Sequence, residues 1–531
     1  MATQTETIVL EPLPAKSGQT SEYEVPLGSS TQAPEFQLLT HGEEYVAQTP
    51  SLLRKITVPL ILAGINFASS CSNGLVVIGL PRITQNLNLP ASLAFWPASV
   101  NSLATASTIL LAGSVADVIG PRSVDLVGNI LSGAMMLGAG FVQTGEQLVV
   151  MRALQGVGLA LHFSSSVALV TKIMPRGRGR NLAFACLGLS QPLGFCFGLV
   201  IGGVLTDSIG WRAGWYLYGS ITLLLTAIGF WSLPKSAPLG SLQSVLHSLK
   251  TQVDWVGAFL GSAFLALVCY FLASISADVE KAKEPGSIVV LCLGVITLPL
   301  FIAWGHRQVK TGKPAMIPNS FWRIGAFSSI CITVASSFGV VNSLELFASL
   351  FFQEIQGLTA LQAAIRIIPS LVVGVLTNAV IGMFVHKIPA VWIIVVTAVV
   401  SSVAPLLMAV IQPEWPYWTN AFIAQLLMPI NANALFTVGM IVITDIFPED
   451  KQSLAGAVFN TAGQFGTAFG YSIMQVISAL VSQGQDGMKP SQALMEGYRA
   501  AFWAMLAMTL SAAIIAAFGL RKTGKIGGKQ D

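Results

Sequence analysis

Two side chains that can exchange protons near neutral pH, His162 and Glu345, stand inside long apolar stretches of the sequence. Glu345 is the one carboxylate well inside such a stretch, and a carboxyl group surrounded by apolar residues can bind and release a proton near neutral pH. Glu345 is therefore a candidate proton-coupling residue, and His162 is a candidate for relaying a proton. In the alternative interpretation, both side chains form hydrogen bonds that only stabilise the structure.

The remaining reactive residues give no sign of covalent chemistry. The five histidines and the carboxylates form no cluster with the spacing of a catalytic or metal site, and the six cysteines include no close-spaced pair. All six cysteines fall inside apolar segments, where we interpret them as packing residues. We therefore predict that the protein is not an enzyme and that it uses no cofactor and no metal.

The elements that must hold these side chains are membrane-spanning helices. Of all residues, 53% are hydrophobic and only 10% are charged, which excludes a water-soluble surface. Segments of roughly 20 apolar residues cross the ~30 Å hydrocarbon layer as helices, because only a helix satisfies its own backbone there. Fourteen such segments lie at about 56–80, 93–116, 123–143, 148–173, 182–205, 213–232, 254–275, 287–305, 324–352, 362–385, 389–411, 418–444, 454–481 and 499–520. The predicted fold class is an all-α polytopic membrane protein.

Basic residues predict how the chain is oriented in the membrane. Of the 28 lysines and arginines, Arg152 and Arg366 lie within spans, 20 lie on the side that holds both chain ends, and six lie on the opposite side. Because basic loops stay in the cytosol, both termini are predicted to be cytosolic. The net charge of +4 reflects this topology and does not indicate nucleic acid binding. We predict the plasma membrane as the location, with the vacuolar membrane as the alternative.

Polar side chains indicate which helices face a central path, because such groups are costly in lipid. They occur inside spans 1, 2, 4 and 5 and inside spans 9, 10, 12 and 13. If spans 7 and 8 are an insertion, the remainder forms two six-helix pseudo-repeats whose first, second, fourth and fifth helices line the path. The residues predicted to line a substrate cavity are Asn73, Asn101, Gln191, Phe338, Asn342, Asn431, Asn460 and Gln464.

The predicted organisation has five parts. They are a disordered cytosolic tail at 1–54, an N-terminal six-helix bundle at 55–232, a linker with two extra transmembrane helices at 233–322, a C-terminal six-helix bundle at 323–520 and a cytosolic tail at 521–531. The first 50 residues hold seven Glu, one Lys and no apolar run long enough for a signal peptide, a composition typical of disorder. We predict a monomer.

The turn after the second span reads Gly113-Ser-Val-Ala-Asp117-Val-Ile-Gly120-Pro-Arg122. Its glycines allow a tight turn, and Asp117 can pair with a cation or a helix start. The turn resembles the signature loop of the major facilitator superfamily, G-x-x-x-D-x-x-G-x-R, at every specified position. The resemblance implies that Asp117 and Arg122 belong to a latch between the two halves on the cytosolic side. The alternative is an ordinary polar loop.

The fourth span begins Leu148-Val-Val-Met-Arg152-Ala-Leu-Gln155-Gly156 and is similar to a second motif of the same family. In that family the arginine faces the central cavity and takes part in proton coupling, so the resemblance implies this role for Arg152. The alternative is an arginine that extends its charged end toward the nearby membrane surface.

The fifth span carries glycines at nearly every fourth position: Gly194, Gly198, Gly202 and Gly203. Such a face allows another helix to approach closely. The run resembles the antiporter motif G-x-x-x-G-P-x-x-G-G, except that Leu199 stands where the motif has proline. The sequence therefore predicts a helix-packing seam, and the resemblance implies antiport.

Similarity to one group within the superfamily extends over the chain after residue 50. The group is the fourteen-span drug:proton antiporters, of the fungal toxin, drug and aminotriazole-resistance exporter type. Three further runs carry the resemblance: Asp254-Trp255-x-Gly257, Phe352-Gln353-x-x-x-Gly357 and Gly497-Tyr498-Arg499-Ala-Ala-Phe502. Such antiporters have an acidic residue in span 1, about nine residues before a proline, whereas the stretch before Pro81 has Asn73 and no carboxylate. Glu345 is the predicted substitute.

These features together predict a secondary active transporter that exports a small organic compound by proton antiport. The compound would be a drug, a toxin or a secondary metabolite. A cavity lined by amide and aromatic side chains, with few charges, favours amphipathic or weakly charged molecules. The missing acid in span 1 leaves an alternative, which is a proton-coupled or facilitative carrier for a nutrient or a small inorganic acid.

Overall fold

A computed structural model describes residues 52–90, 93–174, 178–234, 241–277, 282–385, 387–485 and 488–521. The predicted tails at 1–54 and 521–531 lie outside these residues, except for positions 52–54 and 521. The helices all belong to one compact unit, which extends from Pro50 to Asp531.

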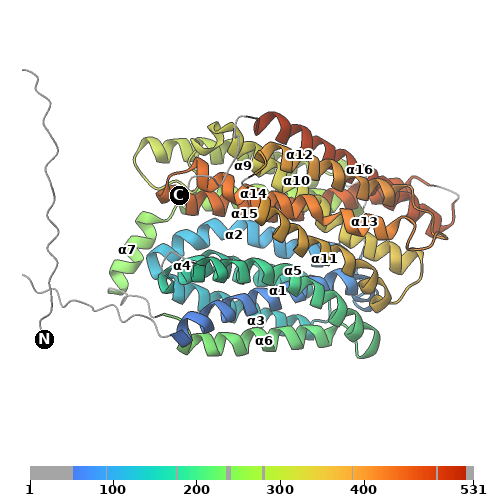
Figure 1. The fold of residues 1–531 in the computed structure, drawn as a ribbon, viewed down its shortest axis with the longest axis horizontal. Helices are drawn as coiled ribbons and strands as arrows, with labels where there is room; N and C mark the ends of the chain where they lie inside the picture. Colours follow the sequence, from blue (N-terminus) through green and yellow to red (C-terminus); the bar gives the residue numbers. More distant parts are fainter. Residues whose placement is uncertain are drawn as a thin grey trace, which may run out of the picture. The chain divides into compact units, whose positions relative to one another are not determined.

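Helices make up the structure, and no strand occurs in the described ranges (Figure 1). The first six are α1 (Leu52–Asn86), α2 (Trp96–Ile119), α3 (Pro121–Phe141), α4 (Gly145–Ile173), α5 (Arg178–Ser208) and α6 (Arg212–Ser232). A short helix α7 (Leu242–Gln252), the pair α8 (Trp255–Ala277) and α9 (Pro285–Lys310), and the 3-10 turn η2 (Phe321–Arg323) follow. The remainder comprises α10 (Gly325–Leu350), the π-helical turn η3 (Phe351–Ile355), α11 (Ala360–Phe384), α12 (Ala390–Ala409), α13 (Ala421–Leu427), α14 (Pro429–Ile446), α15 (Glu449–Gln483) and α16 (Pro490–Gly519).

Fourteen helical segments among the described residues are long and apolar enough to cross a membrane. One of them combines α10 with η3, and another combines α13 with α14, which only Met428 separates. This count confirms the predicted all-α class with fourteen spans. The sequence did not predict α7, whose eleven residues are too few to span a membrane.

Successive spans run in opposite directions, so α1 begins and α16 ends at the same end of the bundle, on the left of Figure 1. We call this the proximal end, and we call the other end, where α1 and α5 finish and α11 begins, the distal end.

Two six-helix halves can be distinguished, α1–α6 and α10–α16, which meet where α2 packs on α15 and where α5 packs on α11. The inserted helix α8 contacts both α2 and α15, and α9 packs on α8. Ser262 on α8 donates a hydrogen bond to the Ser107 carbonyl on α2 at 2.9 Å, and the rings of Phe264 and Phe465 lie 6.3 Å apart. The inserted pair therefore lies beside one of the two contacts between the halves.

The first and fifth helices of each half approach closely at glycines. A Cβ atom at Gly198 on α5 would lie 2.2 Å from the Cys71 carbonyl oxygen on α1. In the second half, a Cβ atom at Gly466 on α15 would lie 2.0 Å from the Ala335 carbonyl oxygen on α10. In both halves, the first and fifth helices thus come into close backbone contact at a glycine, as expected of a pseudo-repeat.

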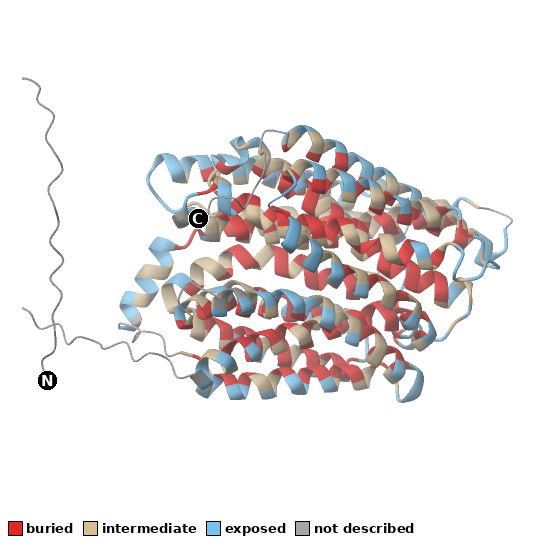
Figure 2. Ribbon diagram, viewed as in Figure 1, coloured by how far each residue is buried: buried red, intermediate tan, exposed pale blue. Residues whose placement is uncertain are grey.

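Burial follows the same division of the helices. Buried residues concentrate where helices of the bundle face one another, and exposed residues cover its outer faces (Figure 2). Helix α9 is the most exposed of the spans, because only 6% of its most apolar 18-residue stretch is buried. Exposed apolar side chains at these positions match a hydrocarbon solvent and would be unfavourable in water.

Candidate functional site

Arg152 occupies the centre of a polar network in the first half. Its side chain on α4 is 1% exposed. Nε donates to the Pro97 carbonyl oxygen at 3.0 Å, Nη1 donates to Gln155 Oε1 at 2.8 Å, and Nη2 donates to Asn73 Oδ1 at 2.8 Å. The guanidinium also lies over the ring of Trp215, 5.4 Å from its centre. Arg152 therefore does not extend toward the membrane surface, and α1, α2, α4 and α6 all hold it.

The acceptors around Arg152 are neutral. Asn73 Oδ1 also accepts a hydrogen bond from Asn101 Nδ2 at 3.3 Å, and Ser72 Oγ accepts from Gln155 Nε2 at 2.8 Å. Two of the predicted cavity residues, Asn73 and Asn101, are thereby joined to Arg152. Among the described residues, no carboxylate forms an ion pair with Arg152, so its positive charge is solvated by dipoles alone.

Glu345 lies on α10 in the second half and is 8% exposed. It forms no hydrogen bond and no ion pair with any residue that the structure describes. Tyr471 on α15, itself buried, lies near enough to interact electrostatically with both Glu345 and Arg152. Tyr471 is thus a buried group that interacts with charged side chains of both halves. It could not be predicted from the sequence, because a lone tyrosine in an apolar segment gives no distinctive signal.

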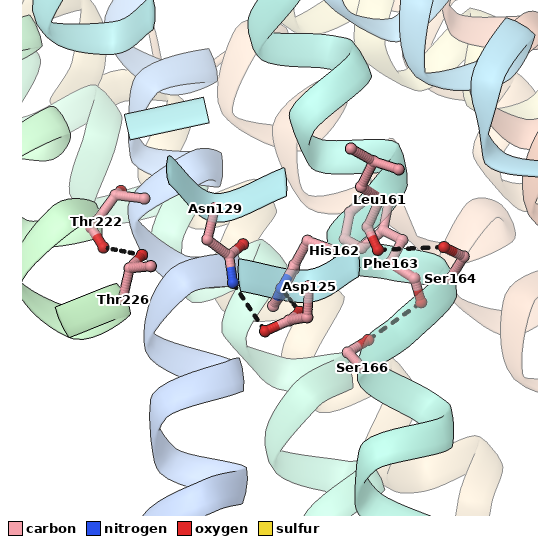
Figure 3. A network of polar contacts seen from close by, with 9 residues as sticks. All are labelled: Asp125, Asn129, Leu161, His162, Phe163, Ser164, Ser166, Thr222 and Thr226. Carbon is pink, nitrogen blue, oxygen red and sulfur yellow. Dashed lines mark hydrogen bonds and ion pairs between the residues drawn. The ribbon is translucent and has the colours of Figure 1, made fainter. Parts of the chain in front are cut away.

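His162 is paired with a carboxylate in the interior of the first half (Figure 3). Its Nδ1 atom on α4 lies 2.8 Å from Asp125 Oδ1 on α3, and both side chains are completely buried. Asn129 Nδ2, one turn along α3, donates to Asp125 Oδ2 at 2.9 Å. The other ring nitrogen of His162, Nε2, is buried and has no hydrogen-bond partner in the described part of the chain. The i, i+4 spacing of Asp125 and Asn129 places these two side chains on one face of α3, but nothing in the sequence links them to His162.

Two of the predicted cavity residues in the second half bond to neighbouring helices of that half. Asn431 on α14 is buried and donates to Ser337 Oγ on α10 at 2.8 Å. Asn342 on α10 donates to its own-helix Phe338 carbonyl at 2.8 Å and to Thr467 Oγ1 on α15 at 3.3 Å. Both amides therefore have partners within the protein, and Asn342 is the less buried of the two.

The other predicted cavity residues form no hydrogen bond to a described residue of another helix. Gln191 on α5 is exposed, and neither it nor the partly exposed Gln464 on α15 has a hydrogen-bond partner among the described residues. Asn460 donates to the Gly456 carbonyl oxygen of its own helix at 3.0 Å. The ring of Phe338 packs against Phe436 with centres 6.1 Å apart. The two glutamine side chains are thus free to bond to a ligand.

The turn after α2 lies at the proximal end. Gly120 has φ of +95° there, a conformation that side chains rarely adopt, which explains the glycine. Arg122 donates to the Phe230 carbonyl oxygen and lies over the Phe230 ring, so it bonds within its own half. Asp117 is exposed and forms no hydrogen bond or ion pair with a described residue. A Cβ atom at Gly113 would lie 4.0 Å from Ser164 Cβ. In the described part of the chain, no bond joins this turn to the second half.

The glycine seam of α5 has two faces. Cβ atoms at Gly194, Gly198 and Gly202 would meet α1 of the same half at 3.0 Å or less. A Cβ atom at Gly203 would instead lie 2.9 Å from Leu361 Cα, at the start of α11 in the other half. The seam therefore contributes both to the packing of one half and to the contact between the halves.

Curated relatives are similar to this chain in sequence, and solved structures are similar to it in fold. MFS-type transporter 1 of Pyricularia oryzae is 36% identical, covering 92% of this chain and 86% of its own length. The low affinity ammonium transporter of Saccharomyces cerevisiae is 24% identical over 77% of each chain, and efflux pump terJ of Aspergillus terreus is 21% identical over 90% of each. A solved bacterial homologue of the human lysosomal transporter Spinster, in an inward-facing and occupied conformation, has a TM-score of 0.62 at 16% identity and covers 87% of this chain and 96% of its own.

The likeness to solved structures concerns the fold, whereas the sequence matches concern the family. The sequence profile described as Major Facilitator Superfamily matches residues 62–419 and 367–530, which together cover most of the chain. With fourteen apolar spans and a relative of 36% identity, the protein is a multi-pass membrane transporter, not an enzyme, and it belongs to the major facilitator superfamily.

Proposed function

We propose that the protein exports a small organic compound, such as a drug, a toxin or a secondary metabolite, in exchange for protons. The observation that carries the proposal is the environment of Glu345, which is buried and has no ion-pair partner among the described residues. Burying an unpaired charge is costly, whereas binding a proton removes the charge. Efflux pump names among the relatives support export as the direction.

Arg152 and Tyr471 give the proton on Glu345 a way to act on both halves. Tyr471 interacts electrostatically with Arg152 of the first half and with Glu345 of the second. Protonation of Glu345 would remove its negative charge beside Tyr471, while Arg152 keeps its neutral acceptors. The proton thereby shifts the balance between two arrangements of the halves, which is what coupling requires.

We assign His162 to the same function as a second proton-accepting group. Asp125 Oδ1 lies 2.8 Å from its Nδ1 atom and fixes the orientation of the ring. The buried Nε2 atom, without a partner among the described residues, is the atom that would accept the proton. This assignment adds Asp125 and Asn129 to the coupling residues, because they hold the imidazole in place.

The proposed substrate site consists of the amide and aromatic side chains between the halves. They supply hydrogen-bond donors, acceptors and a ring surface but no charge, which suits amphipathic or weakly charged compounds. The set is Asn73, Asn101, Gln191, Phe338, Asn342, Asn431, Asn460 and Gln464. Gln191 and Gln464, with no partner among the described residues, are the first candidates for direct contact.

The proximal end is proposed to face the cytosol, as the distribution of basic residues predicts. The Asp117 turn then lies on the cytosolic side, where its carboxylate would close the latch in an alternative arrangement of the halves. A solved structure of similar fold was captured in an inward-facing state. The absence of bonds from Asp117 to described residues of the other half is consistent with that state.

One specific observation favours a second candidate function. Asn73 supplies an amide to Arg152, and the stretch of α1 before Pro81 has no carboxylate, unlike the antiporters that the sequence resembles. A site without that acid suits a carrier that moves a nutrient or a small inorganic acid, and a relative of 24% identity is named an ammonium transporter. In this candidate function the protein takes its substrate up or lets it equilibrate.

Transport into everted membrane vesicles distinguishes the two functions. Radiolabelled amphipathic compounds and radiolabelled small nutrients are supplied outside, with and without an imposed gradient that is acid inside. The proposal expects an amphipathic compound to accumulate only with the gradient, and the signal to vanish when a protonophore is added. Accumulation of a nutrient inside right-side-out vesicles, or equilibration of a substrate that does not depend on the gradient, would establish the second function instead.

A further inference from the structure

The first turn of α11 is capped partly by the other half of the protein. A helix leaves its first N–H groups without partners inside the helix. Thr359 and Gln362 form a capping box, in which Thr359 Oγ1 accepts from the Gln362 N–H at 3.3 Å and Gln362 Oε1 accepts from the Thr359 N–H at 3.1 Å. The N–H groups of Ala360 and Leu361 donate instead to the carboxylate of Asp207, at 3.3 and 2.9 Å.

Asp207 belongs to the other half, at the last turn of α5. The two helices come close enough for this contact because residue 203 is glycine, whose ideal Cβ would lie 3.1 Å from the Leu361 nitrogen and 2.9 Å from its Cα. Gly203 and Asp207 are four residues apart and therefore lie on one face of α5. Gly203 allows α11 to approach α5, and Asp207 binds the first turn of α11.

Two more bonds join the halves at the same end. Ser349 Oγ on α10 donates to the Val77 carbonyl oxygen on α1 at 3.1 Å. Gln353 Nε2, in the π-helical turn η3, donates to the Ile78 carbonyl oxygen at 3.0 Å. Two separate helix pairs, α5 with α11 and α1 with α10, are thus bonded across the halves at the distal end, whereas the Asp117 turn at the proximal end makes no such bond to a described residue.

We propose that Asp207 and the first turn of α11 form a lock, the distal lock, that holds the distal ends of the two halves together. A carboxylate at a helix N-terminus is favoured both by hydrogen bonds and by the helix dipole. The Asp207 side chain is exposed, although its bond to the buried Ala360 is partly covered, and both partners can bond to water when the halves separate. The lock is therefore weak enough to open in each transport cycle, and Ser349 with Gln353 supports it from the second helix pair.

This inference rests on the transporter having two arrangements of its halves, not on proton coupling or on the substrate. The test measures a distance in the full-length protein in lipid nanodiscs, with spin labels at Ile209 and Ile365. These residues lie beside the end of α5 and one turn into α11, and they are 72% and 55% exposed. The native cysteines are replaced, and double electron–electron resonance records the distance distribution without substrate.

The unmodified lock is expected to give a predominant short distance. Asp207→Ala removes the acceptor for two N–H groups, so the ratio of short to long distances should fall about fivefold, the typical effect of losing a helix cap. Asp207→Asn keeps an acceptor without the charge, so its ratio of short to long distances should lie between those of the unmodified protein and Asp207→Ala. Gly203→Ala should lengthen the distance as well, because its added Cβ has no room beside Leu361.

Ser208→Ala is the matched control, because the Ser208 hydroxyl bonds to the Val204 carbonyl within α5 and not across the halves. Unchanged distributions in Asp207→Ala and Gly203→Ala, with thermal unfolding as in the parent protein, would overturn the lock. If Asp207→Ala does not fold, the Asp207→Asn and Gly203→Ala distributions decide. A failure of pH-driven transport in vesicles would overturn the proposed function and leave these distances unaffected, so the two failures can be distinguished.

Discussion

Asn73 Oδ1 lies 2.8 Å from Arg152 Nη2, so a neutral amide holds the buried guanidinium. A carboxylate at this position would neutralise Arg152 within its own half. With the amide, no carboxylate of a described residue forms an ion pair with Arg152, and Tyr471 of the other half interacts electrostatically with Arg152 and with Glu345.

This arrangement predicts different effects for two substitutions of Asn73. Asn73→Ala leaves a buried charged donor one bond short and should lower the free energy of unfolding by about 1.5–3 kcal/mol. Asn73→Asp retains an acceptor and should keep most of the stability. Thermal unfolding in detergent, followed by tryptophan fluorescence, measures both, and a larger loss for Asp than for Ala would show that the amide only packs.

The close contact between α5 and α1 predicts that Gly198→Ala destabilises the first half. The added Cβ would lie 2.2 Å from the Cys71 carbonyl oxygen, so the helices must separate, at a cost of about 1–3 kcal/mol. Gly188→Ala on the same helix is the control, because nothing lies within 4 Å of its Cβ position. Thermal unfolding of both variants is the measurement, and equal unfolding temperatures would disprove the seam.

The signature loop predicts that Asp117→Asn inserts and folds normally but severely slows transport. The variant should shift the balance between the two arrangements without removing substrate contacts, so substrate binding should persist. Transport into vesicles and binding in detergent are measured on the same preparation, with Ser114→Ala as a neighbouring control because the Ser114 hydroxyl bonds only to the Leu110 carbonyl of its own helix. Near-normal transport by Asp117→Asn would make the turn an ordinary connector.

The basic residues predict that both termini face the cytosol. A tag after Asp531 and a tag in the loop at 278–286 should then react oppositely to an impermeant reagent in intact cells. The loop tag should be labelled, and the C-terminal tag should be labelled only after the membrane is made permeable. Labelling of both tags from the same side would contradict the fourteen-span topology.

The spans could be predicted because each one is a long local signal in the sequence, set by the thickness of the bilayer. The Gly198 seam could be predicted for a similar reason, since four-residue glycine spacing is local. The pairing of His162 with Asp125 could not, because it joins α4 to α3 and depends on how the helices are rotated against each other. The same is true of the cap that Asp207 supplies to α11.

Polarity alone also gave an incomplete account of the site residues. Asn431 and Asn73 looked alike in the sequence, as single amides in apolar spans. In the structure, Asn431 bonds Ser337 within the second half, whereas Asn73 bonds the charged Arg152. An amide in a span can form its hydrogen bonds within the protein or leave them for a ligand. Only the residues around it in the structure distinguish these two cases.

The most direct test of the central claim is Glu345→Gln, measured in proteoliposomes by two assays on one preparation. Gln keeps the size and hydrogen bonding of Glu but cannot exchange a proton, and Glu146→Gln, at an exposed residue at the start of α4, is the control. Glu345→Gln should abolish substrate accumulation driven by a pH gradient, while substrate exchange at equal concentrations on both sides persists because exchange needs no net proton movement. Accumulation against a gradient with unchanged pH dependence in Glu345→Gln would contradict the account.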